Sequence, residues 1–301
     1  MPKLTVLMSV YNGDKYLSLA IESILQQTFK NFEFLIINDA STDKTREIIL
    51  SYKDPRIRLL ENLKNIGLTA SLNKGLKIAL GEYIARQDAD DISLPKRLEK
   101  ELRVAESRPE VAVICSDSKH FVTKTNIDLT KKEKDGQKES LRKIYLNDLA
   151  EGNLFFHGSV LFKKDLILEL GGYDENFKKS QDYELWLRIS RKSLILKIEK
   201  ILYLGRIHFE SISWKNILEQ EKYAALARRQ HFKENSMNRL SLRKHLAYRK
   251  KAASRLYDFG KVFFRNKKKN TAFLLWSKSF FLSPLVMIRQ LSLSLKNKNF
   301  K

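Results

Sequence analysis

The amino-acid sequence predicts an α/β fold with a mostly parallel central sheet flanked by helices. The arrangement of apolar residues along the chain supports this prediction. Short apolar runs alternate with longer segments of helical periodicity over the first 115 residues, and that alternation is typical of parallel strands joined by helices that cover the sheet. The predicted strands are residues 4–10, 32–37, 57–60, 82–85 and 111–115.

The predicted helices lie between these strands, at residues 15–27, 43–53, 68–80 and 95–107. Ser41, Thr42 and Asp43 stand where the second helix begins, and such side chains commonly accept hydrogen bonds from the first N–H groups of a helix. We therefore expect them to cap it. Residues 116–140 are polar and are expected to form a hairpin or a loop. The core then resumes with a strand at 159–162, a short helix ending near Gly171, a helix at 181–192 and a strand at 194–200.

Size and cysteine content limit the class of protein. The chain has 301 residues, 43% of them hydrophobic, enough for one domain of roughly 200 to 250 residues and an appendage. Its single cysteine, Cys115, lies in an apolar run, so neither a disulfide nor a cysteine-ligated metal is expected. The start of the chain lacks the segments of a secretory signal. These features predict a cytoplasmic protein that is not exported.

Charge is distributed unevenly and places a domain boundary near residue 214. Residues 1–214 contain 35 Lys and Arg against 31 Asp and Glu, whereas residues 215–301 contain 22 against 4. We therefore expect a first domain at 1–214 and a basic helical region at 215–301. Such a region can bind nucleic acid, anionic lipid or an acidic partner, and net charge alone does not distinguish them.

Large apolar residues within the basic region favour a membrane surface. Phe273–Trp276 and Phe280–Leu282 lie among its lysines and arginines, which is the composition of helices that lie in a membrane interface. Lys278 and Pro284 interrupt the stretch, so it falls short of the roughly 18 to 20 apolar residues that cross a bilayer. The prediction is a peripheral contact with an anionic membrane surface. The alternative is a helical subdomain packed on the core.

Acidic residues follow two of the predicted strands. Asp88, Asp90 and Asp91 come after the strand at 82–85, and Asp39 ends the strand at 32–37. The carboxyl ends of strands are where open α/β sheets bind ligands. Carboxylates this close repel one another, and a hard divalent cation such as Mg²⁺ or Mn²⁺ would relieve that repulsion. The alternative interpretation is a solvated acidic turn.

Further motifs accompany these acids in a fixed order: Val10-Tyr11-Asn12-Gly13, Gln26-Gln27-Thr28, Asn38 to Asp43, Asn65-Ile66-Gly67, Asp88 to Asp91 with Ile92-Ser93-Leu94-Pro95, His157-Gly158-Ser159, Gly171 to Glu175, Asp182 with Glu184 to Arg188, and Arg206-Ile207-His208. In this order and spacing the chain resembles bacterial family 2 glycosyltransferases over roughly residues 3–214. The resemblance implies the GT-A nucleotide-sugar-binding fold.

The resemblance assigns the nucleotide pocket to the ends of the first two strands. It implies that Asp39 contacts the uracil base and that Val10, Tyr11 and Asn12 line the nucleotide pocket. The family often has a second acid where Asn38 stands, so the local charge is lower here.

A second group is expected at the diphosphate. The resemblance implies that Asp88 contacts the ribose or the sugar and that Asp90 binds the metal, Mg²⁺ or Mn²⁺, on the diphosphate. His208 matches a position that helps to hold the metal or the diphosphate in part of the family. Arg206 could pair with phosphate oxygens.

The acceptor side is expected around Asp182. This residue corresponds to the general base of the family, which deprotonates an acceptor hydroxyl as it attacks the anomeric carbon and so inverts the configuration. The alternative is an exposed acid in the first turn of a helix, stabilised by the helix dipole. Gln181 stands where the family often has Glu, and His157 is a candidate organiser of the acceptor loop.

These expectations together predict an inverting glycosyltransferase of bacterial cell-surface polysaccharide synthesis. Its partners would be a UDP-sugar donor, a glycan or lipid-linked acceptor and the inner face of the cytoplasmic membrane. A non-catalytic scaffold of the same fold is one alternative. A nucleic-acid-binding protein is another, although the basic region matches none of the usual reading modules. A dinucleotide-dependent oxidoreductase would need a Gly-x-Gly-x-x-Gly turn after the first strand, which the sequence lacks.

Overall fold

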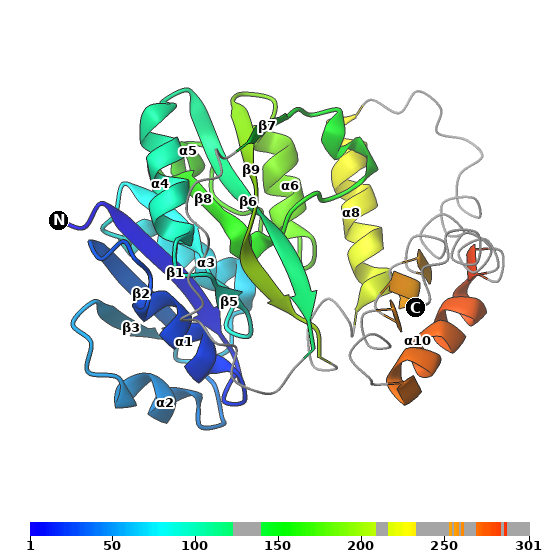
Figure 1. Ribbon diagram of the computed structural model, residues 1–301, viewed down its shortest axis with the longest axis horizontal. Coiled ribbons are helices and arrows are strands. Elements are labelled where there is room, and N and C mark those ends of the chain that lie inside the picture. Colours follow the sequence, from blue (N-terminus) through cyan, green and yellow to red (C-terminus); the bar gives the residue numbers. More distant parts are fainter. Residues whose placement is uncertain are drawn as a thin grey trace. The chain divides into compact units, whose positions relative to one another are not determined.

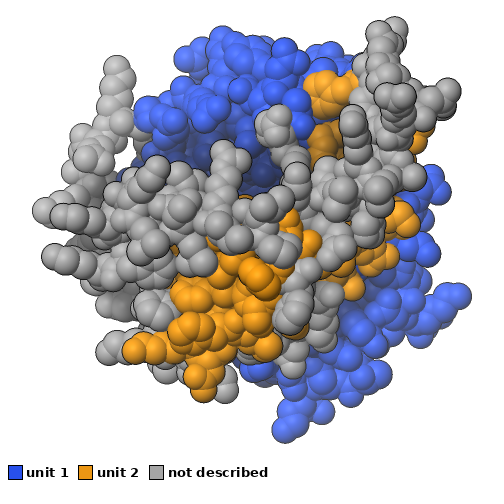
Figure 2. Space-filling model, turned by 90° about the vertical axis from the view of Figure 1, so that its right-hand side faces the viewer, with its two compact units in different colours: residues 1–119, 125–206 blue, residues 120–124, 207–301 orange. Residues whose placement is uncertain are grey.

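The computed structural model describes residues 1–122, 140–208 and 216–232, and of the remaining chain residues 253–254, 256–258, 260–261, 269–283 and 286–287. It divides into two compact units, coloured separately in Figure 2: residues 1–119 with 125–206, and residues 120–124 with 207–301. The boundary predicted at residue 214 lies outside the described residues, as do residues 123–139 of the predicted hairpin or loop.

Four parallel strands form one half of the sheet in the first unit. They are β1 (Leu4–Val10), β2 (Phe32–Asn38), β3 (Ile57–Glu61) and β4 (Tyr83–Arg86), in the order β3-β2-β1-β4. The first three of these strands are labelled in Figure 1. The helices α1 (Leu17–Leu25), α2 (Thr45–Ser51) and α3 (Leu68–Ile78) connect them. β1, β2 and β4 are mostly apolar and buried at nearly every position, as expected for parallel strands whose two faces are both covered.

The two faces can be followed from alternate residues of β1. Val6 and Met8 belong to the core cluster that also contains residues of α1 and of α4 (Arg97–Ser107). Leu7 points to the opposite face, where Gly75 of α3 lies so close that an added Cβ would stand 2.5 Å from its Cδ1 atom. Glycine therefore allows α3 to approach the sheet, and successive β1 residues serve both layers.

The other half of the sheet is joined to the first by antiparallel pairing. β8 (Val160–Lys163) pairs with β4, and β6 (Val111–Phe121), β9 (Leu194–Arg206) and the short β5 (Ile92–Ser93) follow in that order, with β7 (Leu141–Ile144) beside β9. The predicted α/β fold is confirmed, with a sheet that is parallel in its first four strands and mixed as a whole. β9 runs six residues beyond the predicted strand end, and two-residue β5 is too short to give a periodic pattern.

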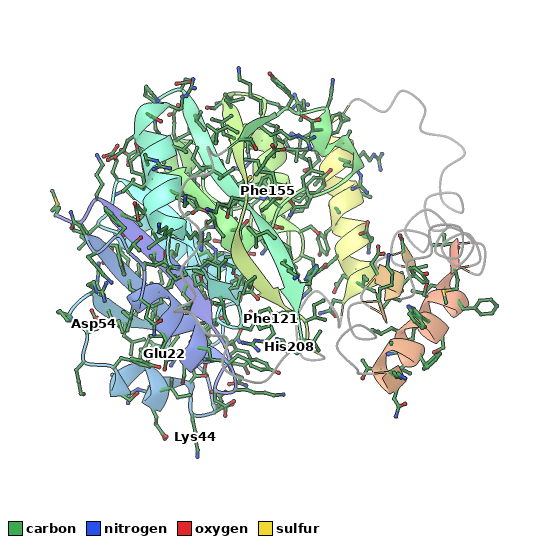
Figure 3. The ribbon with its side chains drawn as sticks, viewed as in Figure 1. Glu22, Lys44, Asp54, Phe121, Phe155 and His208 are labelled. Atoms are coloured by element: carbon green, nitrogen blue, oxygen red, sulfur yellow. The ribbon has the colours of Figure 1, made fainter. Side chains whose placement is uncertain are left out.

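Two more helices complete the first unit, α5 (Lys164–Glu169) and α6 (Gln181–Ile189). α6 packs through the fully buried Trp186, whose ring lies 5.4 Å from that of Phe155, labelled in Figure 3. Arg86 and Arg97 are also fully buried, which is unusual for a charged residue and requires partners. Arg97 meets this requirement with Glu101, one turn further along α4, at 3.1 Å.

The second unit has a small core of its own. Its described helices include α8 (Ile217–His231) and α10 (Lys269–Leu282), and Leu275 and Trp276 of α10 pack with Leu256 and Tyr257. The Trp276 indole N–H donates to the Tyr257 carbonyl at 3.1 Å. Among the residues that the structure describes, no helix is long and apolar enough to cross a membrane.

Candidate active site

The turn after β1 is held to the segment after β2 by side-chain hydrogen bonds. Asn12 adopts a positive φ of 51°, its backbone N–H donates to Ser41 Oγ at 3.0 Å, and its Oδ1 accepts from the Thr42 N–H at 2.8 Å. Ser41 and Thr42 therefore do not cap α2, contrary to the prediction, because the β1 turn takes up their polar groups. Asp43 does accept at the start of the helix, from the Thr45 N–H at 2.9 Å.

Tyr11 lies on the exposed side of the same turn and is 50% exposed. Val10 is buried, and its carbonyl accepts a hydrogen bond from the Asp39 N–H at 2.9 Å. Gly13 faces the acidic loop after β4, since an added Cβ would stand 3.9 Å from that of Ala89. The structure thus brings the predicted nucleotide residues of β1 and β2 to the edge that also carries the acidic loop.

Asp39 is buried and accepts three hydrogen bonds. Its Oδ1 accepts from Asn62 Nδ2 at 2.8 Å and from the Ile66 N–H at 3.0 Å, and its Oδ2 accepts from the Gly67 N–H at 2.9 Å. Gly67 has a φ of 87°, a conformation that glycine adopts at little cost. Asp39 thereby fixes the loop between β3 and α3 against the end of β2.

The loop from Asp88 to Asp91 is shaped by the residue before it. Gln87 is fully buried, and its Nε2 donates to the carbonyls of Asp88 at 3.0 Å and Asp91 at 3.1 Å. Its Oε1 accepts from Ser93 Oγ at 2.6 Å and from Arg97 Nη1 at 3.3 Å. A buried amide that uses both its donor and its acceptor groups in this way holds a loop in one conformation.

Asp88 is paired with a buried cation that the sequence analysis missed. Arg86 Nη2 donates to Asp88 Oδ1 at 2.6 Å, and the Asp88 N–H donates to the Tyr203 hydroxyl at 3.3 Å. Burial raises the pKa of Asp88; the Arg86 charge opposes that shift and the Asp90 charge adds to it. The pKa of Asp91 rises well above its usual value through burial and through the charges of Asp90 and Asp88.

Arg206 closes the loop from the end of β9. Its Nε donates to the Asp90 carbonyl at 2.7 Å, its backbone N–H donates to Asp91 Oδ1 at 2.7 Å, and its guanidinium carbon lies 4.5 Å from the centre of the Tyr16 ring. Burial lowers the pKa of Arg206. The Arg206 side chain therefore supports the acidic loop by holding the Asp90 carbonyl, and its predicted contact with phosphate stays a prediction.

Asp182 lies in the first turn of α6, where its Oδ2 accepts from Asn153 Nδ2 at 2.7 Å. Ser180 before it has a positive φ of 54°. Burial raises the pKa of Asp182, a backbone hydrogen bond from Tyr183 lowers it, and the charge of Asp88 raises it. Asp182 is partly buried and accepts a side-chain hydrogen bond, unlike the solvated helix acid of the alternative interpretation.

His157 and Gly158 lie beside Asp88. His157 Nε2 is 3.3 Å from Arg86 Nε and 2.7 Å from the Tyr173 hydroxyl. A Cβ on Gly158 would stand 1.8 Å from the Tyr203 hydroxyl oxygen and 2.9 Å from Asp88 Oδ2. The predicted organiser of the acceptor loop therefore contacts the side chain that pairs with Asp88.

His208 follows β9 and belongs to the second unit, where the neighbouring Ile207 N–H donates to the Phe121 carbonyl at 2.9 Å; Phe121 and His208 are labelled in Figure 3. Its predicted metal role stays a prediction. Within the part of the chain that the structure describes, no three His, Cys, Asp or Glu side chains are grouped as a complete metal site.

The acidic loop nevertheless fits a divalent cation bound together with a substrate. Mg²⁺ is usually held by one or two carboxylates plus substrate phosphates rather than by a cage of protein ligands. Burial is the first cause of the raised pKa values of Asp88 and Asp91, and the Asp90 charge raises both further, so a cation at the loop would favour the charged carboxylates. The donor set therefore suits a hard cation.

The fold is that of the GT-A glycosyltransferases. The structure resembles S. aureus TarS 1-349 in complex with UDP-GlcNAc, with a TM-score of 0.61 at 15% identity, covering 93% of this chain and 91% of TarS 1-349. It also resembles the mannosyltransferase PcManGT of Pyrobaculum calidifontis in complex with GDP-Man and Mn²⁺, with a TM-score of 0.60 at 14% identity, covering 100% and 81%.

The chain belongs to glycosyl transferase family 2, whose family model matches residues 5–168. It is 35% identical over 237 residues to an uncharacterized glycosyltransferase of Methanocaldococcus jannaschii, covering 77% of this chain and 80% of that protein. It is also 35% identical over 195 residues to the putative glycosyltransferase EpsE of Bacillus subtilis, covering 62% of this chain and 66% of EpsE. The predicted family is confirmed, and with it the activity class of a transferase.

Proposed function

We propose that this chain is an inverting glycosyltransferase that moves a sugar from a UDP-sugar to a hydroxyl of a glycan or lipid-linked acceptor in bacterial cell-surface polysaccharide synthesis. The observation that carries this proposal is the placement of two partly buried acids on separate elements, Asp88 in the loop after β4 and Asp182 in the first turn of α6. Hydrogen bonds connect the two sides, from Asp88 through Arg86 and His157 to the Tyr173 turn, which a side chain of α6 holds. That arrangement suits an acceptor base facing a donor-binding group across a reaction centre. Complexes of TarS with UDP-GlcNAc and of PcManGT with GDP-Man and Mn²⁺ support a nucleotide-sugar donor.

In the proposed reaction, Asp182 removes the proton from the acceptor hydroxyl as its oxygen attacks the anomeric carbon. The bond from that carbon to the diphosphate breaks on the opposite face, so the configuration inverts. Asp90 would hold Mg²⁺ or Mn²⁺, and the cation would supply electrostatic stabilisation of the leaving diphosphate. The metal role of His208 stays a prediction from the family resemblance. Asp88 would contact the ribose or the sugar.

The nucleotide is proposed to bind along the ends of β1 and β2. Tyr11 is exposed enough to contact a base, Asn12 and Val10 shape the turn, and Asp39 fixes the adjoining loop. Arg206 would act chiefly by holding the backbone of the acidic loop, and its contact with phosphate is part of the proposal.

Calorimetric titration of UDP, first with Mn²⁺ and then with EDTA, tests the donor site. We expect binding that depends on the metal and that Asp90→Asn abolishes. Asp182→Asn should bind UDP as tightly as the wild type and lose transfer by about 10²- to 10⁴-fold, the usual contribution of a general base. Asp165→Asn is the matched control, because Asp165 is an exposed acid in the first turn of α5. Full transfer activity in Asp182→Asn would remove the base assignment.

The proposal includes a peripheral position on the inner face of the cytoplasmic membrane. α10 buries Ala272, Leu275 and Trp276 but leaves Phe273 and Leu274 59% and 48% exposed. Exposed aromatic and aliphatic residues among lysines are the composition of helices that lie in a membrane interface, and the basic composition of residues 215–301 favours an anionic lipid surface as the cover.

Flotation with vesicles of phosphatidylglycerol and phosphatidylcholine tests the membrane contact. The full chain should bind these vesicles at low salt and bind pure phosphatidylcholine less. The double variant Phe273→Ser with Leu274→Ser should lose most of the binding. Leu80→Ser is the control, since Leu80 is 48% exposed in the first unit. Equal binding by the double variant would place the membrane contact elsewhere, and self-association abolished by the same variant would identify a second copy of the chain as the cover.

A further inference from the structure

A buried arginine stands between the two sides of the site. Arg86 is 0% exposed, and its Nη1 donates to the carbonyls of Leu7 at 2.6 Å and Gln87 at 2.9 Å. These two bonds fix the guanidinium plane to β1 and to the end of β4. The remaining directions are thereby set: Nη2 reaches Asp88 at 2.6 Å and Nε points to His157 Nε2 at 3.3 Å.

The His157 ring receives two donors on one nitrogen. Arg86 Nε and the Tyr173 hydroxyl, at 2.7 Å, both lie at its Nε2 atom. That nitrogen can accept only when the ring is neutral and its proton is on Nδ1. Burial and the Arg86 charge keep the pKa of His157 well below its usual value, in agreement with a neutral ring. His157 therefore links Arg86 to Tyr173 as an acceptor.

Tyr173 is held from two helices. Its backbone N–H donates to Asn73 Oδ1 at 2.8 Å, and its carbonyl accepts from Asn73 Nδ2 at 2.9 Å, which ties it to α3. The turn before it is tied to α6, because Arg188 Nη1 donates to the carbonyls of Leu170 at 2.6 Å and Gly172 at 2.9 Å. α6 is the helix whose first turn carries Asp182.

We propose that Arg86, His157 and Tyr173 are positioning residues that hold Asp88 in register with Asp182. This inference rests on the proposed function, since it assigns Asp88 to the donor and Asp182 to the acceptor. The three side chains form a continuous path from the acidic loop through the Tyr173 turn to α6. Misplacement of reacting groups by about 1 Å can cost about 10²-fold in rate, so a rigid connection between the two sides has a direct kinetic consequence.

A purely structural role is the competing explanation, and a double-mutant cycle separates the two. His157→Leu removes the acceptor, Tyr173→Phe removes only a hydroxyl, and His157→Gln restores an acceptor oxygen. If the network acts through Asp88, His157→Leu should weaken binding of UDP with Mn²⁺ by about fivefold or more in the wild type and should have little effect in an Asp88→Asn background, because residues of one network are not additive. His157→Gln should recover binding to within about twofold of the wild type, since it can still accept from Arg86.

Turnover gives a second readout in the full-length protein. UDP release from UDP-glucose and UDP-N-acetylglucosamine should fall by about 10- to 100-fold in kcat for Tyr173→Phe, with KM changed by less than about threefold. Tyr52→Phe is the matched control, because the Tyr52 hydroxyl donates to the Ser18 carbonyl at 3.3 Å and is not part of the network. An equal loss of kcat in Tyr173→Phe and Tyr52→Phe would overturn the proposal.

The cycle also distinguishes failure of the network from failure of the proposed function. If the wild-type chain binds no UDP, the proposed donor is wrong, and the wild type, His157→Leu, Asp88→Asn and their double variant are compared by melting temperature. The double variant should then melt within about 2 °C of the less stable single variant, because both changes break one network. Shifts that simply add, in binding or in melting temperature, would refute the positioning role.

Discussion

Replacing Gly158 by alanine tests the close packing beside Asp88. The added Cβ would stand 1.8 Å from the hydroxyl oxygen of Tyr203 and 2.4 Å from its Cζ, far inside normal contact. The ring cannot easily move away, because Tyr203 is fully buried and its backbone pairs with that of Ser93 on the neighbouring strand. The centre of its ring also lies 5.1 Å from the Arg97 guanidinium carbon. Overpacking of this kind costs about 1 to 3 kcal/mol.

The expected melting temperature of Gly158→Ala is lower by about 2 to 12 °C, taking about 2 to 4 °C per kcal/mol for a unit of this size. Nucleotide binding should suffer as well, because Asp88 Oδ2 lies 2.9 Å from the new methyl position. Loss of one hydrogen bond to a charged group, worth about 1.5 to 3 kcal/mol, corresponds to roughly 10- to 100-fold weaker UDP affinity.

Differential scanning fluorimetry and calorimetric titration of UDP with Mn²⁺ measure the two effects. Gly81→Ala is the control, since its Cβ would stand 2.3 Å from the Thr5 backbone nitrogen near the start of β1, whereas the acidic loop follows the end of β4. It should lose stability and keep its UDP affinity. A Gly158→Ala protein with wild-type melting temperature and affinity would refute the packing argument, and loss of stability alone would separate Gly158 from the donor site.

Two further predictions follow from the buried charges. Asn153→Ala removes a hydrogen bond that lowers the pKa of Asp182. Because a base acts only when deprotonated, the acid limb of the kcat/KM profile should move to higher pH, and an unmoved limb would argue against Asp182 as the base. Arg97→Met should leave Glu101 unpaired in the core and lower the free energy of unfolding by about 3 to 5 kcal/mol. Urea titration measures it, and a loss below about 1 kcal/mol would show that Glu101 finds another partner or takes up a proton.

The donor side of the site could be predicted from sequence because it depends on local order. Asp39 and Asp88 each follow an apolar run, and parallel strands bring such positions to one edge. Asp182 was predicted through family resemblance. Arg86 could not be found in the same way: it ends an apolar strand, and its partner His157 lies 71 residues away. Periodicity indicates which face of an element is buried, whereas contacts between distant segments exist only once the whole sheet has assembled.

The helix caps show the same limit on a smaller scale. Ser41 and Thr42 have the composition of capping residues, but Asn12, about 30 residues earlier, binds both. Local propensity is thus overridden where tertiary contacts offer the same hydrogen bonds.

The antiparallel pairing of β4 with β8 divides the first unit into two parts, to which different steps of the proposed reaction are assigned. The part before this seam contains β1 to β4 and the groups assigned to the nucleotide; the part after it contains His157, Tyr173 and Asp182. If the proposed roles hold, substitutions on the acceptor side can change acceptor preference while the nucleotide side stays as it is, provided that the seam register, in which Ile84 faces Phe162, is retained. Recombination between relatives at this seam would also have to keep Arg86 and His157 compatible, because their contact crosses it.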